Sequence, residues 1–160
     1  MQSSRPKMSK ADDNFVSARS MLASDIPQPD SKSGRPFDEL YRLKDVLGTG
    51  AFSTVREGYH KSDRDRMFAV KCITKAKLTE EDAAALLDEV DILRELRHSH
   101  IIRLFDVFEE PRYYYLVMEK MTGGELFDRD VEKADYNLKE ARGTCKVILE
   151  AVGYCHKHQV

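Results

Sequence analysis

The stretch Leu47-Gly48-Thr49-Gly50-Ala51-Phe52-Ser53-Thr54-Val55 decides the fold of this chain. Glycine lacks a Cβ and adopts backbone angles that other residues avoid, so Gly48 and Gly50 predict a tight loop whose N–H groups can lie against an anion. The residues from Val55 to Tyr59 favour a strand after the loop. We therefore expect a β-hairpin rather than the strand-to-helix turn of a dinucleotide-binding fold. The alternative is an ordinary glycine turn without a ligand.

A lysine on a neighbouring strand strengthens the anion-binding interpretation. Lys71 lies in the apolar run Phe68–Ile73, where an ammonium group either reaches solvent or needs a partner, because burying it unpaired is costly. Thr79 begins a predicted helix with apolar residues at helical spacing, and Glu89 lies along that apolar stripe. We expect Lys71 and Glu89 to form an ion pair between strand and helix. The alternative is that Glu89 is solvated like the acidic residues around it.

Composition excludes several classes of protein. The 160 residues are 41% hydrophobic and carry 26 Lys and Arg against 28 Asp and Glu, a net charge of -2 that gives no electrostatic case for nucleic-acid binding. Neither an apolar run of membrane-spanning length nor the hydrophobic core of a signal peptide is found, so we expect no membrane partner. Three cysteines without a CxxC spacing favour a reducing, intracellular and cytoplasmic setting (Cys72, Cys145 and Cys155). The two His-x-His pairs lack metal-site spacing, so we predict no metal site (His98/His100 and His156/His158).

The remaining pattern predicts a mixed α+β chain behind a disordered tail. Residues 1–36 are rich in Ser, Lys, Asp and Pro and have few apolar anchors, so we expect them to be disordered. Strands and helices follow from the apolar periodicity. The strands are expected at residues 41–47, 53–59, 67–73, 104–108 and 113–118, and the helices after Thr79, at 125–131 and at 139–158.

A second motif makes this pattern more specific. It reads Tyr115-Leu116-Val117-Met118-Glu119-Lys120-Met121-Thr122-Gly123-Gly124-Glu125-Leu126-Phe127-Asp128. Together with the glycine-rich loop and Lys71, this segment resembles a Ser/Thr protein kinase, most of all the calcium/calmodulin-dependent group, from about Tyr41 to residue 160. The resemblance implies an α+β fold with a kinase N-lobe and hinge at 37–121, built from a five-stranded antiparallel sheet and one main helix. The start of the kinase C-lobe would occupy 122–160.

The kinase resemblance also implies a ligand and a role for each site residue. ATP is the implied ligand, and Lys71 and Glu89 are the implied catalytic pair, in which Glu89 orients Lys71 onto the α- and β-phosphates. Met118 would be the gatekeeper residue behind the adenine. The adenine edge would bond the carbonyl of Glu119 and the N–H of Met121. The other implied nucleotide contacts are Leu47, Gly48, Thr49, Gly50, Ala51, Phe52, Ser53, Val55, Ala69 and, near the ribose, Glu125.

Two kinase motifs do not occur in these 160 residues. They are the His-Arg-Asp catalytic loop, whose aspartate accepts the substrate proton, and the Asp-Phe-Gly sequence, whose aspartate holds Mg²⁺. We therefore expect a truncated, catalytically incomplete chain that binds ATP but does not phosphorylate the protein substrate of the complete enzyme. The rival hypothesis is a non-catalytic interaction or regulatory module derived from a kinase N-lobe. The last helix would expose an apolar stripe from Ala141 to Cys155, which predicts low stability and binding by a chaperone.

Overall fold

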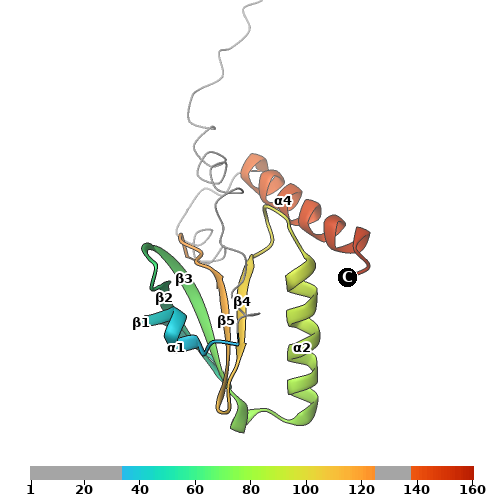
Figure 1. The fold of residues 1–160 in the computed structure, drawn as a ribbon. Coiled ribbons are helices and arrows are strands. Elements are labelled where there is room, and N and C mark those ends of the chain that lie inside the picture. Colours follow the sequence, from blue (N-terminus) through green and yellow to red (C-terminus); the bar gives the residue numbers. More distant parts are fainter. Residues whose placement is uncertain (1–33, 125–137) are drawn as a thin grey trace, which may run out of the picture.

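The computed structural model describes residues 34–124 and 138–160. Its centre is a five-stranded antiparallel sheet with the strand order β1-β2-β3-β5-β4. The long helix α2 lies along one face of the sheet, the short helix α1 lies on the other side, and α4 crosses the end of α2 (Figure 1). This arrangement confirms the predicted α+β fold. The elements, in chain order, are α1 (Phe37–Leu40), β1 (Tyr41–Thr49), β2 (Ser53–His60), β3 (Asp63–Thr74), the 3₁₀ helix η3 (Lys75–Lys77), α2 (Glu80–Glu95), β4 (Leu104–Glu109), β5 (Tyr113–Glu119) and α4 (Leu138–Lys157).

The hairpin between β2 and β3 is longer than the sequence predicts. β3 already begins at Asp63, and only Lys61 and Ser62 remain as the turn because His60 pairs directly with Asp63. The first residues of β3 are charged and exposed, so backbone pairing rather than burial holds them in a strand. An apolar pattern therefore cannot reveal this part of the strand.

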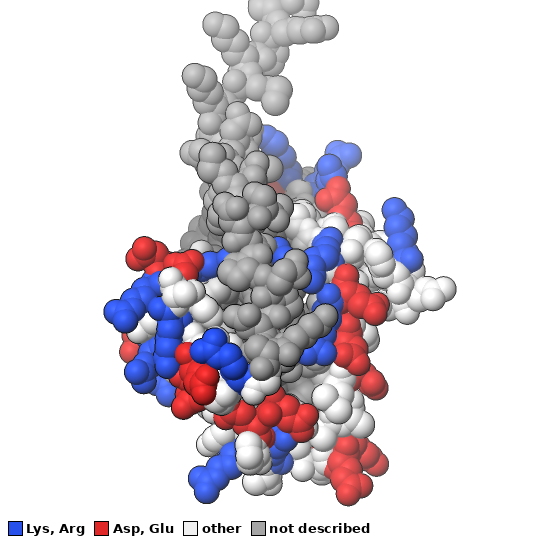
Figure 2. All heavy atoms as spheres, in the orientation of Figure 1, with Lys and Arg blue, Asp and Glu red and all other residues white. Residues whose placement is uncertain are grey.

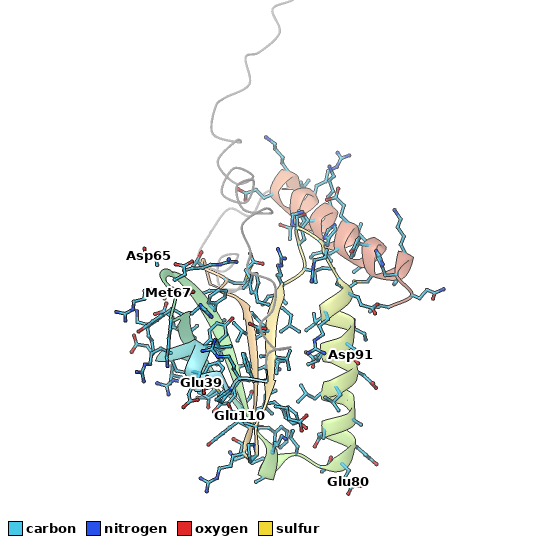
Figure 3. All side chains as sticks on the ribbon, in the orientation of Figure 1. Glu39, Asp65, Met67, Glu80, Asp91 and Glu110 are labelled. Carbon is cyan, nitrogen blue, oxygen red and sulfur yellow. The ribbon has the colours of Figure 1, made fainter. Side chains whose placement is uncertain are left out.

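One face of the sheet, which we call the α1 face, is covered by residues that precede β1. Phe37 of α1 is buried, and its ring stacks on Tyr115 with the ring centres 4.2 Å apart. Its N–H donates to the side chain of Glu110 at 2.8 Å, and Glu110 lies beside α1 (Figure 3). The Tyr41 hydroxyl donates to the buried Asp106 carboxylate at 2.7 Å. The core of the α1 face consists of Phe37, Leu40, Tyr41, Phe68, Val70, Cys72, Phe108 and Val117.

The opposite face, which we call the α2 face, packs against α2. Thr79 caps this helix as predicted: its side chain accepts from the Asp82 N–H at 3.1 Å, and the Asp82 carboxylate accepts from the Thr79 N–H at 3.1 Å. Leu86 and Val90 are buried, while acidic side chains line the solvent side of the helix (Figure 2). The core of the α2 face consists of Ile73, Leu86, Val90, Leu104, Tyr114 and Leu116.

Helix α4 contains no buried residue and exposes an apolar stripe, as its periodicity predicts. Ile148, Leu149 and Val152 are 49%, 69% and 43% exposed. Tyr154 joins the helix to the rest of the molecule, because its hydroxyl accepts the Arg97 N–H at 3.0 Å. The helix predicted at 125–131 and residues 1–33 of the predicted tail lie outside the described residues. Among the described helices, none is long and apolar enough to cross a membrane.

Candidate functional site

The register of β2, β3 and β5 brings four of the predicted site residues onto one strip of the sheet. Val55 pairs with Lys71, and Ala69 pairs with Met118. Lys71 and Ala69 are two residues apart on β3, so all four side chains leave the sheet on the same side. Met118 packs against the core of the α2 face, which identifies that side. We call Val55, Ala69, Lys71 and Met118 the candidate strip.

The glycine-rich loop forms the predicted β-hairpin beside the candidate strip. The Gly50 N–H donates to the Ser53 carbonyl at 2.8 Å and closes the turn between β1 and β2. The Phe52 carbonyl accepts from the Thr74 N–H at 3.0 Å and so fixes the loop to the end of β3. The loop is therefore held by backbone hydrogen bonds at a defined position next to the strip.

The glycines of this loop do not take the backbone angles that the sequence predicts. Among the described residues, the glycines with positive φ are Gly34, Gly123 and Gly124. Gly48 and Gly50 therefore have angles that other residues adopt as well. A Cβ built on Gly48 would meet nothing within 4 Å. The absence of a side chain at Gly48 therefore leaves open space beside the loop backbone, and no strained backbone angle requires glycine there.

The predicted ion pair between Lys71 and Glu89 is not formed in this structure. Lys71 is half-buried and Glu89 is exposed. Within residues 34–124 and 138–160, neither side chain makes a salt bridge or a hydrogen bond. The physical reason is the rotation of α2. Leu86 and Val90 face the sheet, and Glu89 lies about 80° around the helix from the mean direction of these two side chains. The contact between Lys71 and Glu89 therefore stays a prediction for the nucleotide-bound chain.

The predicted hinge begins at the end of β5. The Glu119 N–H donates to the Arg103 carbonyl at 2.9 Å, which fixes the end of β5 against the residue before β4. Met121 lies beyond the strand and is 65% exposed. Glu125 lies outside the described residues. Glu119 and Met121 thus continue the chain directly from Met118 of the candidate strip, and their contacts with a ligand stay predictions.

An ion-pair network that sequence reasoning missed spans the same strip. Glu57 pairs with Ala69 on β3, and its carboxylate lies 2.5 Å from Lys120 Nζ and 3.3 Å from Lys44 Nζ. The hydrogen bond from Lys120, followed by that from Lys44, lowers the pKa of Glu57. The network therefore ties β1, β2 and the segment after β5 together across Ala69. Strand alternation places Glu57 on the face of Val55, but Lys120 is 63 residues away and no local pattern reveals it.

The first His-x-His pair, His98 and His100, contributes to the contact between α4 and the segment before β4. His98 packs its ring against Tyr154 with the ring centres 4.9 Å apart, and His100 Nε2 lies 4.0 Å from the Glu150 carboxylate. In the part of the chain that the structure describes, no three His, Cys, Asp or Glu side chains form a group that could hold a metal ion.

Comparison with known proteins identifies the family. The model of the protein kinase domain matches residues 41–160, and the chain therefore belongs to the protein kinase domain family. The chain is 48% identical over 122 residues to calcium/calmodulin-dependent protein kinase type 1 of Caenorhabditis elegans, an alignment that covers 76% of this chain and 35% of the relative. It is 44% identical over 123 residues to the kinase of the same name from Macrobrachium nipponense, covering 77% of this chain and 35% of the relative.

A third relative belongs to another kinase type. Myosin light chain kinase A of Dictyostelium discoideum is 44% identical over 119 residues, which cover 74% of this chain and 40% of the relative. The chain thus spans about a third of the length of the curated relatives that it matches. These matches confirm the predicted resemblance to the calcium/calmodulin-dependent kinases.

Proposed function

We propose that the glycine-rich loop and the candidate strip bind ATP, as the nucleotide site of a Ser/Thr protein kinase of the calcium/calmodulin-dependent type. In this proposal the loop covers the phosphates, and Lys71 contacts the α- and β-phosphates. The adenine lies between the apolar side chains of the strip and the backbone that follows β5. There the Glu119 carbonyl accepts a hydrogen bond and the Met121 N–H donates one.

The half-buried side chain of Lys71, without an anionic partner in the described chain, is the observation that carries this proposal. It stands opposite Val55 and has no anionic partner among the described residues. Gly48, the residue that pairs with Val55 on the other side, leaves open space beside the loop. A triphosphate group supplies the missing negative charge at this place, so its binding would stabilise the arrangement.

The proposed role of Glu89 requires a movement of α2. The family resemblance implies that this carboxylate orients Lys71 in the nucleotide-bound enzyme. In the present structure Glu89 is exposed, so α2 would have to rotate to carry it toward the sheet. We propose that this rotation would bring Glu89 against the Lys71 ammonium group and hold that group in position for the phosphates.

Phosphoryl transfer requires residues that these 160 do not contain. In a protein that also carries the His-Arg-Asp and Asp-Phe-Gly motifs, we propose transfer of the γ-phosphoryl group of Mg²⁺-bound ATP to a Ser or Thr of a protein substrate. Neither motif occurs in residues 1–160. A polypeptide of these residues alone is therefore expected to bind nucleotide without transferring phosphate. An intracellular setting, which supplies ATP, fits this activity.

Titration calorimetry of residues 1–160 with a non-hydrolysable ATP analogue tests the proposed function. Adenosine and tripolyphosphate serve as separate probes for the two halves of the site. Because the analogue engages both halves, it should bind more tightly than either probe. The rival interaction module predicts no binding of the analogue at millimolar concentration, so that result would refute the proposal. Transfer of labelled phosphate to a Ser/Thr peptide is expected to stay at background.

A further inference from the structure

Two arginines and two phenylalanines form a cluster on the α1 face, on the opposite side of the sheet from the candidate strip. The guanidinium carbon of Arg66 lies 5.0 Å from the ring centre of Phe68 and 4.8 Å from that of Phe105. The guanidinium carbon of Arg103 lies 5.2 Å from the same Phe105 ring. The two rings meet edge to face, with centres 5.3 Å apart. We call these four residues the arginine cluster.

A β-bulge in β4 explains why Phe105 lies on this face. The pairing of β4 with β5 shifts register between Leu104 and Asp106. Leu104 belongs to the core of the α2 face, whereas Phe105 packs against the core of the α1 face and Asp106 bonds Tyr41 there. Two consecutive residues therefore point to the same side, as a bulge allows. The irregular pairing thus occurs at the residue whose ring supports both guanidinium groups.

The N–H donors of the two guanidinium groups make no hydrogen bonds within the described residues. Stacking on a ring occupies the flat face of a guanidinium and leaves its five N–H donors in the plane. Neither Arg66 nor Arg103 donates a side-chain hydrogen bond within the described parts of the chain. The Nε of Arg103 is buried and has no partner there. The terminal N–H groups of Arg103 also have no acceptor among the described residues, so an anion brought to them would stabilise this cation.

Positive charge is concentrated at the arginine cluster. Burial, followed by the charges of Arg97 and Arg66, lowers the pKa of Arg103, and Glu119 opposes this effect. Asp65 precedes Arg66 at the end of the β2–β3 hairpin (Figure 3), where strand alternation turns its side chain toward the other face. Arg66, Arg97 and Arg103 outnumber the described carboxylates near the cluster, namely Glu119, which pairs with Phe68 on the same face, and Asp106, which bonds Tyr41. An incoming anion would therefore meet a net positive charge.

We propose that the arginine cluster binds a phosphate group carried by the side chain of a polypeptide. A phosphorylated side chain brings nearly two negative charges and three acceptor oxygens, which suit the free N–H donors of a guanidinium group. The half-buried ring of Phe105 offers contact to an apolar residue beside the phosphorylated one, which a free phosphate ion cannot use. This site is separate from the candidate strip because the two lie on opposite faces of the sheet.

Binding of a phosphoserine peptide with apolar flanking residues to residues 1–160 tests the proposal. Fluorescence anisotropy at constant ionic strength compares it with the same peptide carrying Ser, and inorganic phosphate serves as a competitor. The phosphopeptide should bind at least about tenfold more tightly than the Ser peptide, since charge-assisted hydrogen bonds are lost without the phosphate. Arg66→Gln and Arg103→Gln should each weaken its binding by about tenfold or more. Lys71→Met, on the opposite face, should leave it unchanged.

Several results would overturn the proposal. Equal binding of the phosphorylated and unphosphorylated peptides would show that the phosphate is not recognised. If inorganic phosphate competed with a Kd equal to that of the phosphopeptide, the site would bind the phosphate group alone and make no use of the polypeptide. If Lys71→Met lost binding of the phosphopeptide, the phosphate would lie at the candidate strip instead. The Nε–H NMR resonances of Arg66 and Arg103 in the wild-type chain provide a readout that needs no substitution. They should shift on addition of the phosphopeptide, and unchanged resonances would also overturn the proposal.

Discussion

Replacement of Gly58 by alanine tests the packing of the sheet that carries the candidate strip. Gly58 is buried on β2, where it pairs with Leu43 of β1 and Phe68 of β3. A Cβ at this position would lie 3.0 Å from the carbonyl oxygen of Arg42 and 3.1 Å from Cγ2 of Val70. Both distances are shorter than ordinary van der Waals contact, so the neighbours would have to move.

The expected cost follows from how little these neighbours can move. The Arg42 oxygen belongs to the paired backbone of β1, and Val70 is 0% exposed. Forcing an additional methyl group into a packed core costs about 1–3 kcal/mol. Alanine also restricts the unfolded chain, which offsets about 0.4–1 kcal/mol of that cost. We therefore expect Gly58→Ala to lower the free energy of unfolding by about 1–2 kcal/mol and the Tm by roughly 3–8 °C.

Thermal unfolding followed by circular dichroism measures this effect. Gly153→Ala is the matched control, because Gly153 lies within α4 and a Cβ there would meet nothing within 4 Å. Alanine has the higher helix propensity, so the control should gain up to about 1 kcal/mol. A Tm of Gly58→Ala equal to or above that of the wild type would refute the packing argument.

Two further predictions concern ionisable groups. Lys120 and Lys44 lower the pKa of Glu57 below its ordinary 4.5, so the stability from this network is complete above about pH 4.5 and is lost as the pH falls through the folded-state pKa. The difference in urea midpoint between wild type and Glu57→Gln should therefore be largest near neutral pH and vanish in acid, and a difference that grows in acid would contradict the network. Burial raises the pKa of Cys72 to about 11, whereas Cys145 is exposed. Mass spectrometry after brief thiol labelling of the folded chain should find Cys145 modified well before Cys72, and equal rates would contradict the burial of Cys72.

The sheet and α2 could be predicted because their signals are local. Apolar runs mark the central parts of β3, β4 and β5, and Thr79 with Asp82 forms a cap that is visible within four consecutive residues of the sequence. The glycine-rich loop and Lys71 also lie close together in the chain. Their closeness to Met118 was implied by the family resemblance, and it depends on the order of the strands rather than on any local pattern.

The remaining features depend on contacts between distant residues. Phe37 reaches Tyr115 and Glu110 across the sheet, and a helix of four residues has no periodicity to reveal it. Glu89 is exposed because of how α2 is rotated about its axis, and a rotation by about one residue, or 100°, would bury it. A broad apolar stripe does not resolve that difference, because residues on both edges of the stripe match the same spacing.

The effect of Lys71→Met on nucleotide binding tests most directly whether the candidate strip holds the phosphates of ATP. Lys77→Met is the control, because Lys77 is exposed at the end of η3. A non-hydrolysable ATP analogue at 100 times its Kd stabilises a folded protein by about 2.7 kcal/mol, which raises the Tm.

Loss of a charge-assisted contact of about 1.5–3 kcal/mol should weaken binding by roughly 10- to 100-fold. We predict that the wild type and Lys77→Met show equal increases in Tm with the analogue, whereas Lys71→Met loses about half of the increase or more. An unchanged increase in a folded Lys71→Met protein would contradict the assignment of this site.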